Sequence, residues 1–344
     1  MFDLAHPAAS DWRAFGRSLL KHHESGDVKG LVAISAHWES EQQGVIQVNT
    51  DERNPLVYDY YGFPNYYVSY LSLDWLVKAP TDTPLFIRCS KYDVTFSSTN
   101  PFSFSDLVLS SINASIKTSK PDASISIAKP VSRGLDHGVF VPLRIAFASD
   151  SIFTRSPPLS EVDISRESSS IPSTLPICQI TLPTSSSSPL SSLHLGALLR
   201  SLRAQGIAIF ANGEGVHNLR DLRNWLSISA DRVTGERKMG LKSGAEGYTT
   251  RFLEALTEAV TLPASALVSK DTDAADPRWK AAESLFSHPD YRSAHPTPEH
   301  LLPVLVAVGA TLPHEQLYES MSLPQGSLGY NMFSTEKLDT AVHA

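Results

Sequence analysis

The sequence predicts an α/β protein in which helices flank a mostly parallel central sheet. Several short apolar runs lack polar alternation, which is typical of strands that are covered on both faces. Segments with helical periodicity alternate with these runs, as in a layered α/β fold. The 344 residues are 42% hydrophobic and 19% charged, an ordinary globular composition. We therefore expect a single domain over residues 1–344 with inserted surface loops.

The first expected element is a helix over residues 10–26, where apolar residues recur at helical spacing. Ser10 or Asp11 is suited to cap its start, and Gly26 to end it. The apolar runs predict strands at 30–36 ("GLVAISA"), 123–130, 176–183 and 206–213. Further helices are expected at 104–117, 138–149, 191–204, 246–261 and 299–310.

Two stretches interrupt the alternation of strands and helices. Residues 151–174 are rich in Ser and Pro and have no periodicity, which predicts a flexible surface insertion. Residues 80–101 form a smaller insertion, for which we expect a hairpin.

Composition excludes several classes of function. A net charge of −7 argues against a nucleic-acid partner, because phosphate neutralisation needs a basic surface. No apolar run reaches the roughly 20 residues that cross a bilayer, and residues 1–10 lack the basic region of a secretory signal. Cys89 and Cys178 are isolated, so we expect a cytoplasmic protein whose metal sites use His, Asp or Glu.

Four histidines follow or precede apolar elements at loop positions: His37, His137, His217 and His300. Ligands of open α/β sheets bind beyond the carboxyl ends of strands, where three of these residues are expected. His300 is expected in a first helical turn capped by Thr297, where the helix dipole favours the neutral, metal-binding imidazole.

Each histidine alone is more often a hydrogen-bonded structural residue than a ligand. Asp136 could likewise be a local helix cap beside His137. The coincidence of four such positions favours a metal site. The remaining histidines with exposed or terminal contexts are expected to be surface residues: His22, His23, His194, His314 and His343.

Five motifs occur in one order: "SAHWES", "YDYYGFP", "GLDHGVFVPL", "GVHNLRDL" and "HPTPEHLLPVLVAVGA". Together they resemble the class III extradiol ring-cleavage dioxygenases of the LigB-like superfamily, in the DOPA 4,5-dioxygenase branch of fungal type. The closing "GSLGYNMF" resembles the C-terminal strand of that branch. The resemblance runs from about residue 2 to residue 334, with the two insertions between motifs.

The resemblance implies an extradiol catalytic domain with one metal ion per chain, Fe(II) for ring cleavage or Zn(II). It places His37, His217 and His300 at metal-site positions. His137 falls at a position that supports the site or transfers protons, with His217 as the alternative base. A catechol such as DOPA and O₂ are the implied partners, and the oligomeric state is left open.

Aromatic residues near these motifs are candidates for the substrate pocket: Trp38, Tyr58, Tyr61 and Phe63. A packed turn is an equally good interpretation of "YDYYGFP". Arg220 could contact a substrate carboxylate, although a structural salt bridge is the more common role of such a residue.

The family also carries a His-Gly-Gly/Ser-Pro motif whose histidine is a primary ligand. The present chain opens on "MFDLAHP", which resembles the segment after that motif, so we expect the first strand and its ligand to be absent. His6 is the nearest substitute. Two alternatives to a ring-opening enzyme follow: a non-catalytic or impaired relative, and a zinc-dependent hydrolase on the same scaffold.

Overall fold

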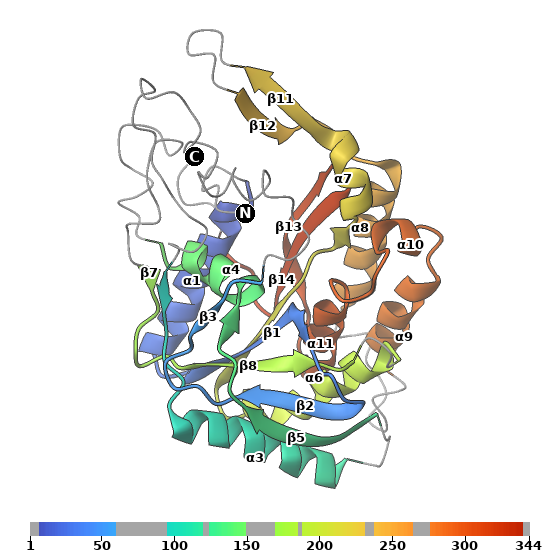
Figure 1. The fold of residues 1–344 in the computed structure, drawn as a ribbon. Helices are drawn as coiled ribbons and strands as arrows, with labels where there is room; N and C mark the ends of the chain where they lie inside the picture. Colours follow the sequence, from blue (N-terminus) through green and yellow to red (C-terminus); the bar gives the residue numbers. More distant parts are fainter. Residues whose placement is uncertain are drawn as a thin grey trace, which may run out of the picture.

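A five-stranded sheet lies at the centre of the fold, with the strand order β5-β2-β8-β1-β9 (Figure 1). The computed structural model describes residues 7–59, 95–119, 124–148, 169–184, 188–230, 237–263 and 276–339. The sheet strands are β1 (Gly30–Glu39), β2 (Gly44–Asn49), β5 (Ile125–Val131), β8 (Ile177–Leu182) and β9 (Ile207–Asn212). Pairing is parallel for β1–β8, β1–β9 and β2–β5, and antiparallel only where β2 meets β8. The predicted α/β class with a mostly parallel sheet is confirmed.

Strand β1, which carries His37, has a partner on each side within this sheet. Val32 lies opposite Cys178 of β8 and Ile209 of β9. The strand continues past the predicted residue 36 as far as Glu39, with an irregular register after Ile34. Strand β2 was not predicted, because its short run "GVIQVN" follows β1 after only four residues.

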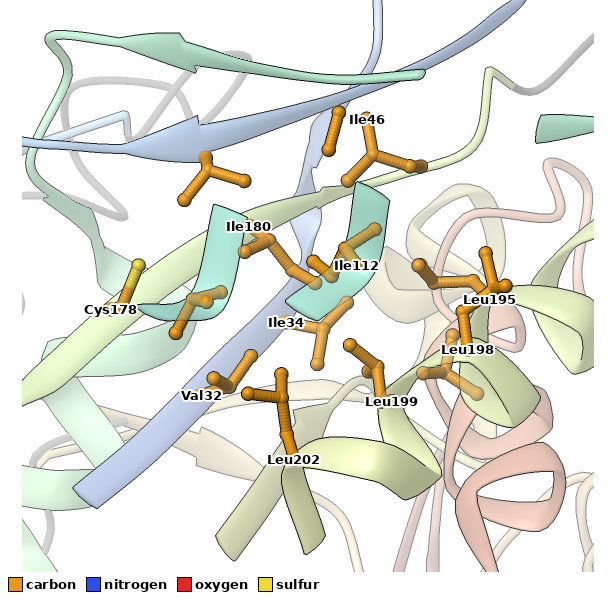
Figure 2. Packing of buried hydrophobic residues seen from close by; sticks show 14 of the residues in the cluster. Val32, Ile34, Ile46, Ile112, Cys178, Ile180, Leu195, Leu198, Leu199 and Leu202 are labelled. Atoms are coloured by element: carbon orange, nitrogen blue, oxygen red, sulfur yellow. The ribbon is translucent and has the colours of Figure 1, made fainter. Parts of the chain in front are cut away.

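Side chains alternate along β1, so that its two faces join different cores. Leu31 and Ala33 pack with helices α1 (Ala8–Glu24) and α4 (His137–Ala146). Val32 and Ile34 pack with α3 (Phe102–Thr118) and α6 (Leu190–Arg203), as Figure 2 shows. Burial of apolar side chains on both sides explains why the strand reads as a continuous apolar run.

A third core lies beside α6 and away from the sheet. It joins α8 (Gly247–Val260), α9 (Pro277–Ser284), the short α10 (Tyr291–Ala294) and α11 (Leu302–Ala310). Phe252, Trp279 and Leu305 are buried within it. Helix α11 also contributes Leu302 and Val306 to the core that contains Val32 and Ile34 of β1. It therefore connects the third core with the core on that face of the sheet.

Small strand pairs attach the remaining segments. β10 (Val216–His217) pairs with β14 (Leu328–Ser334), which pairs with β13 (Tyr318–Gln325). β3 (Leu56–Val57) pairs with β6 (Leu135–Asp136), and β4 (Phe96–Ser97) pairs with β7 (Ser169–Ser170). After α7 (Leu219–Trp225), the hairpin of β11 (Leu226–Ala230) and β12 (Arg237–Leu241) extends away from the body (Figure 1).

Two helices start at residues other than those predicted, and this changes their predicted caps. Helix α1 begins at Ala8, so Ser10 and Asp11 lie in its first turn and neither caps it. Helix α11 begins at Leu302 rather than 299, because residues 298–301 form a turn and Pro303 suits the first helical turn. The predicted Thr297 cap and the helix-dipole argument for His300 are therefore wrong.

Most of the two predicted insertions lies outside the described residues. Their described ends meet, since Phe96–Ser97 pairs in parallel with Ser169–Ser170. None of the helices in the described ranges is long and apolar enough to cross a bilayer.

Candidate metal centre

Four histidine side chains from distant parts of the chain form one continuous row. The ring centroid of His37 lies 4.0 Å from that of His137 and 5.2 Å from that of His300. The rings of His300 and His217 stack at 3.5 Å with an angle of 17° between their planes. The structure thus brings together His37, His217 and His300, the predicted ligand set, and places His137 beside them.

His37 is carried near the end of β1, beyond the point where the strand register becomes irregular. Its backbone N–H donates to the Ser35 hydroxyl at 2.9 Å. Gly138 permits the close approach of this segment, because a Cβ there would lie 2.9 Å from Cδ2 of His37. Trp38 is buried, and its ring packs 4.5 Å from the Arg133 guanidinium.

His137 is the first residue of α4 and is held by Asp59, which the sequence analysis did not identify. Oδ1 of Asp59 accepts from Nδ1 of His137 at 2.7 Å and from its backbone N–H at 3.1 Å. Oδ2 of Asp59 lies 3.5 Å from Nδ1 of His37. One carboxylate therefore contacts two of the predicted histidines. Asp59 lies inside "YDYYGFP", which was the available signal in the sequence. Only the aromatic residues of that motif were considered as functional residues.

Asp136 does not act as the local cap that was considered for it. Its side chain makes no capping hydrogen bond to α4. Instead Oδ2 accepts from Nε2 of Gln179 at 2.5 Å and from the Arg133 guanidinium at 3.1 Å. The first N–H of the helix donates to the Asp59 carboxylate instead.

The rings of His217 and His300 stack, and a backbone hydrogen bond joins the two chain segments that carry them. His217 ends β10, where it pairs with Leu328 of the C-terminal strand β14. The carbonyl of His300 accepts the N–H of Glu214 at 3.1 Å. Gly213 allows this contact, since a Cβ there would lie 2.2 Å from the same carbonyl oxygen.

Two further residues of this region were missed. Oε2 of Glu214 lies 4.0 Å from Nε2 of His217. His295 is fully buried, and its Nε2 lies 2.8 Å from the Gly215 carbonyl oxygen, to which it must donate. "HPTPEH" displays His295 plainly, but only the fold shows that it supports the segment before His217.

Burial keeps the imidazoles of His37, His217 and His300 neutral. Burial, together with a smaller effect of neighbouring histidines, lowers the pKa of His37 to about 4 and that of His217 to about 3. The pKa of His300 lies well below its usual value for the same reasons. A neutral imidazole is the form that binds a metal, so the row is suited to coordination near neutral pH.

Within the described residues, the side-chain nitrogen and oxygen atoms that could bind a metal ion fall into two groups of three. One consists of His37, Asp59 and His137, and the other of Glu214, His217 and His300; in each group the donor atoms lie within 4.8 Å of one another. The predicted ligand set takes His37 from the first group and two residues from the second. Nδ1 of His300 and Oε2 of Glu214 are buried and have no hydrogen-bond partner among the described residues. Buried nitrogen and oxygen atoms that lack a hydrogen-bond partner are suited to bind a metal ion.

Comparisons with known proteins bear on the family. The chain is 28% identical over 284 residues to a 4,5-DOPA dioxygenase extradiol-like protein of Schizosaccharomyces pombe, covering 82% of this chain and 67% of that protein. It is 27% identical over 287 residues to the 4,5-DOPA dioxygenase extradiol of Beta vulgaris, covering 82% and 73%. The chain is a relative of the extradiol DOPA dioxygenases. The predicted resemblance is thereby confirmed.

Two other comparisons extend this result. The dioxygenase tasH of Hapsidospora irregularis is 24% identical to this chain over 292 residues, covering 84% of this chain and 65% of tasH. An uncharacterized protein of Escherichia coli K12 has a similar fold, with a TM-score of 0.50 and 18% identity. The similarity covers 93% of this chain and 91% of that protein. No protein-family model matches the chain.

The predicted pocket residues are only partly described. Tyr58 is half-buried, and its ring meets that of Phe140 edge to face at 5.5 Å. Tyr61, Phe63 and the predicted substitute ligand His6 lie outside the described residues. Arg220 is exposed, and its backbone N–H donates to the side chain of Asn218.

Proposed function

We propose that the protein is an extradiol ring-opening dioxygenase that cleaves a catechol such as DOPA with O₂. The supporting observation is the row formed by His37, His217 and His300 in a chain related to DOPA dioxygenases. A dioxygenase reaction breaks one ring C–C bond beside the diol and leaves both atoms of O₂ in the product. Its reactants therefore need a site that holds two oxygens of the catechol and one molecule of O₂ together.

In this proposal His37, His217 and His300 hold one Fe(II) ion, the ligands that the motifs predicted. Their low pKa values keep nitrogen lone pairs available at neutral pH. The bound metal supplies proximity between the diol and O₂ and a path for electron density between them. Zn(II) fits the same imidazoles, and the reaction measured below distinguishes the two metals.

His137 is the proposed proton acceptor for the catechol hydroxyl. Burial raises the pKa of Asp59, but the hydrogen bonds from His137 hold it below its usual value, so the carboxylate is ionised. Nδ1 of His137 then carries the proton that it donates to Asp59 at 2.7 Å. Nε2 is left with a lone pair, as a general base requires. His217 is the alternative base if it does not bind the metal.

Trp38 and Tyr58 are proposed to border the aromatic substrate. Trp38 is immobilised under Arg133, and Tyr58 against Phe140 of α4. Rigid aromatic walls suit a planar catechol, and they exclude water from the reacting atoms.

Oxygen uptake tests the proposal directly. The protein is loaded with Fe(II) under anaerobic conditions and given DOPA, and O₂ consumption and the absorbance of the ring-opened product are recorded. We expect one O₂ per DOPA and at least a 100-fold loss of rate in His37→Ala. The control His314→Ala changes an exposed histidine and should keep the rate. Hydrolysis of an ester or amide by the Zn(II) form without O₂ uptake would favour the hydrolase alternative and overturn the proposal.

The proposal also includes one catalytic domain over residues 1–344 and a cytoplasmic location. Support for the location comes from the small number of cysteines in the sequence and from Cys178, which is buried and free.

A further inference from the structure

We propose that Glu214 is an additional, carboxylate ligand of the divalent metal ion that the proposed function places among His37, His217 and His300. The donor atoms of Glu214, His217 and His300 lie within 4.8 Å of one another. Oε2 of Glu214 lies 4.0 Å from Nε2 of His217. Ligand atoms bound to one metal at about 2.0–2.2 Å are roughly 3–3.5 Å apart, so binding draws these atoms together and tilts the stacked rings of His217 and His300 until their nitrogen lone pairs point at one ion.

Hydrogen bonding distinguishes this group from the neighbouring group of His37, Asp59 and His137. The Asp59 carboxylate is already engaged, since Oδ1 accepts two hydrogen bonds from His137. Oε2 of Glu214 and Nδ1 of His300, by contrast, are buried and have no partner among the described residues. An unpaired polar atom in the interior is costly, and a cation between these atoms would remove that cost for both.

The backbone holds Glu214 in this position. Its N–H donates to the carbonyl of His300 at 3.1 Å, which ties the two ligand segments together. Three residues further on, His217 is fixed by its pairing with Leu328. Between them, the Gly215 carbonyl accepts from the buried His295 at 2.8 Å. Such support by surrounding hydrogen bonds is what orients the ligands of a metal site.

Two imidazoles and one carboxylate form a recognised donor set for divalent transition metals with open positions, Fe(II) among them. The carboxylate neutralises part of the metal charge inside a largely buried site, which three imidazoles cannot do. We therefore assign to Glu214 a role that "ANGEGVH" did not reveal, since the sequence analysis considered histidines alone. The assignment rests on the proposed function only in placing a metal among these histidines.

Metal affinity, measured without any substrate, tests the assignment. Zn(II) binding is measured by competition with a chromophoric chelator, and Co(II) binding by visible absorption. Glu214→Gln should weaken Zn(II) binding by more than about 100-fold, because loss of a ligand exceeds the 10–100-fold loss typical of outer hydrogen-bond partners. It should also change the Co(II) spectrum. Asp59→Asn should stay within or below the 10–100-fold range.

Two further variants complete the experiment. Asp11→Asn alters another buried carboxylate with one unpaired oxygen, away from the histidine row, and should bind Zn(II) as the wild type does. Glu214→Asp keeps the charge on a shorter side chain and should bind Zn(II) more tightly than Glu214→Gln. If Glu214→Gln does not fold, a Glu214→Asp variant with wild-type affinity and Co(II) spectrum contradicts the proposal.

The test is decided by how much Zn(II) affinity each variant loses and by which variant loses more. A loss below about 100-fold in Glu214→Gln, or a larger loss in Asp59→Asn, would overturn the assignment. Thermal unfolding of the metal-free proteins checks that the folds are equivalent. A wild type that binds Zn(II) through Glu214 but consumes no O₂ with DOPA would contradict the proposed function alone.

Discussion

Oδ1 of Asp59 accepts two hydrogen bonds from His137, one from the ring Nδ1 at 2.7 Å and one from the backbone N–H at 3.1 Å. The same oxygen therefore orients the imidazole and caps the start of α4. Its companion Oδ2 lies 3.5 Å from Nδ1 of His37. Through this single carboxylate the orientation of His137 depends on the position of β1.

Replacement of Asp59 by Asn is the first test of this relationship. An amide oxygen accepts more weakly than a carboxylate, so the tautomer of His137 is less firmly set. We expect kcat for DOPA to fall about 10–100-fold, the usual effect of losing such a supporting partner. Asp51→Asn is the control, because its half-buried carboxylate accepts from Ser132 and, among the described residues, from no other side chain. Equal kcat in the two variants would show that Asp59 does not orient the base.

The free energy of unfolding of the metal-free protein should depend on pH through the buried histidines. Burial lowers the pKa of His37 to about 4 and that of His217 to about 3, against 6.5 for a free histidine. Below pH 6.5 the unfolded chain therefore binds more protons than the folded one, and stability falls as the pH drops toward 4. Above pH 7 both states are neutral and these residues contribute nothing. Acidification should remove on the order of a few kcal/mol.

Glu214 acts in the opposite direction, so a variant is needed to isolate the histidine contribution. Burial raises its pKa from 4.5 to about 8, and its contribution to stability is lost as the pH rises through that value. Urea unfolding of wild type and His217→Gln at pH 5 and pH 7.5 separates the two effects. The variant should lose less stability on acidification. An identical loss would mean that His217 is not neutral in the fold.

Substitution of His300 by Ala should abolish metal-dependent stabilisation. A metal at 100 times its dissociation constant stabilises a folded protein by about 2.7 kcal/mol. We expect added Zn(II) to raise the unfolding temperature of the wild type and of His314→Ala, whose histidine is exposed. His300→Ala should respond to Zn(II) no more than to Mg(II). A full response in this variant would place the metal elsewhere.

Gly138→Ala should disturb the row without removing any ligand. An added Cβ would lie 2.5 Å from the Ser35 hydroxyl and 2.9 Å from Cδ2 of His37, so the His37 ring must shift. A displacement of this size at a reacting centre can cost on the order of 100-fold in rate. Val139→Ala is the matched control in the same helix: it should lower stability by roughly 2 kcal/mol and keep kcat. A Gly138→Ala variant with wild-type kcat and metal affinity would contradict the close approach.

The strands and helices around the row were largely predictable because their signals are local. The run "GLVAISA" predicts a strand covered on both faces, and Leu31 and Val32 do enter opposite cores. Apolar periodicity likewise predicted α6 within one residue at each end. The predicted start of α11 at residue 299 was wrong, because no local signal shows that residues 298–301 form a separate turn before the helix.

By itself the sequence determined the α/β class, the family resemblance and which four histidines were candidates for a metal site, since each depends on residues close together in the chain. Only the tertiary structure decided which donors meet. Asp59 reaches His137 across 78 positions, and His295 reaches Gly215 across 80. It also decided that Asp59 is hydrogen-bonded while Oε2 of Glu214 has no partner among the described residues. Whether a carboxylate is satisfied depends on buried neighbours that folding brings from elsewhere in the chain, and no local pattern records them.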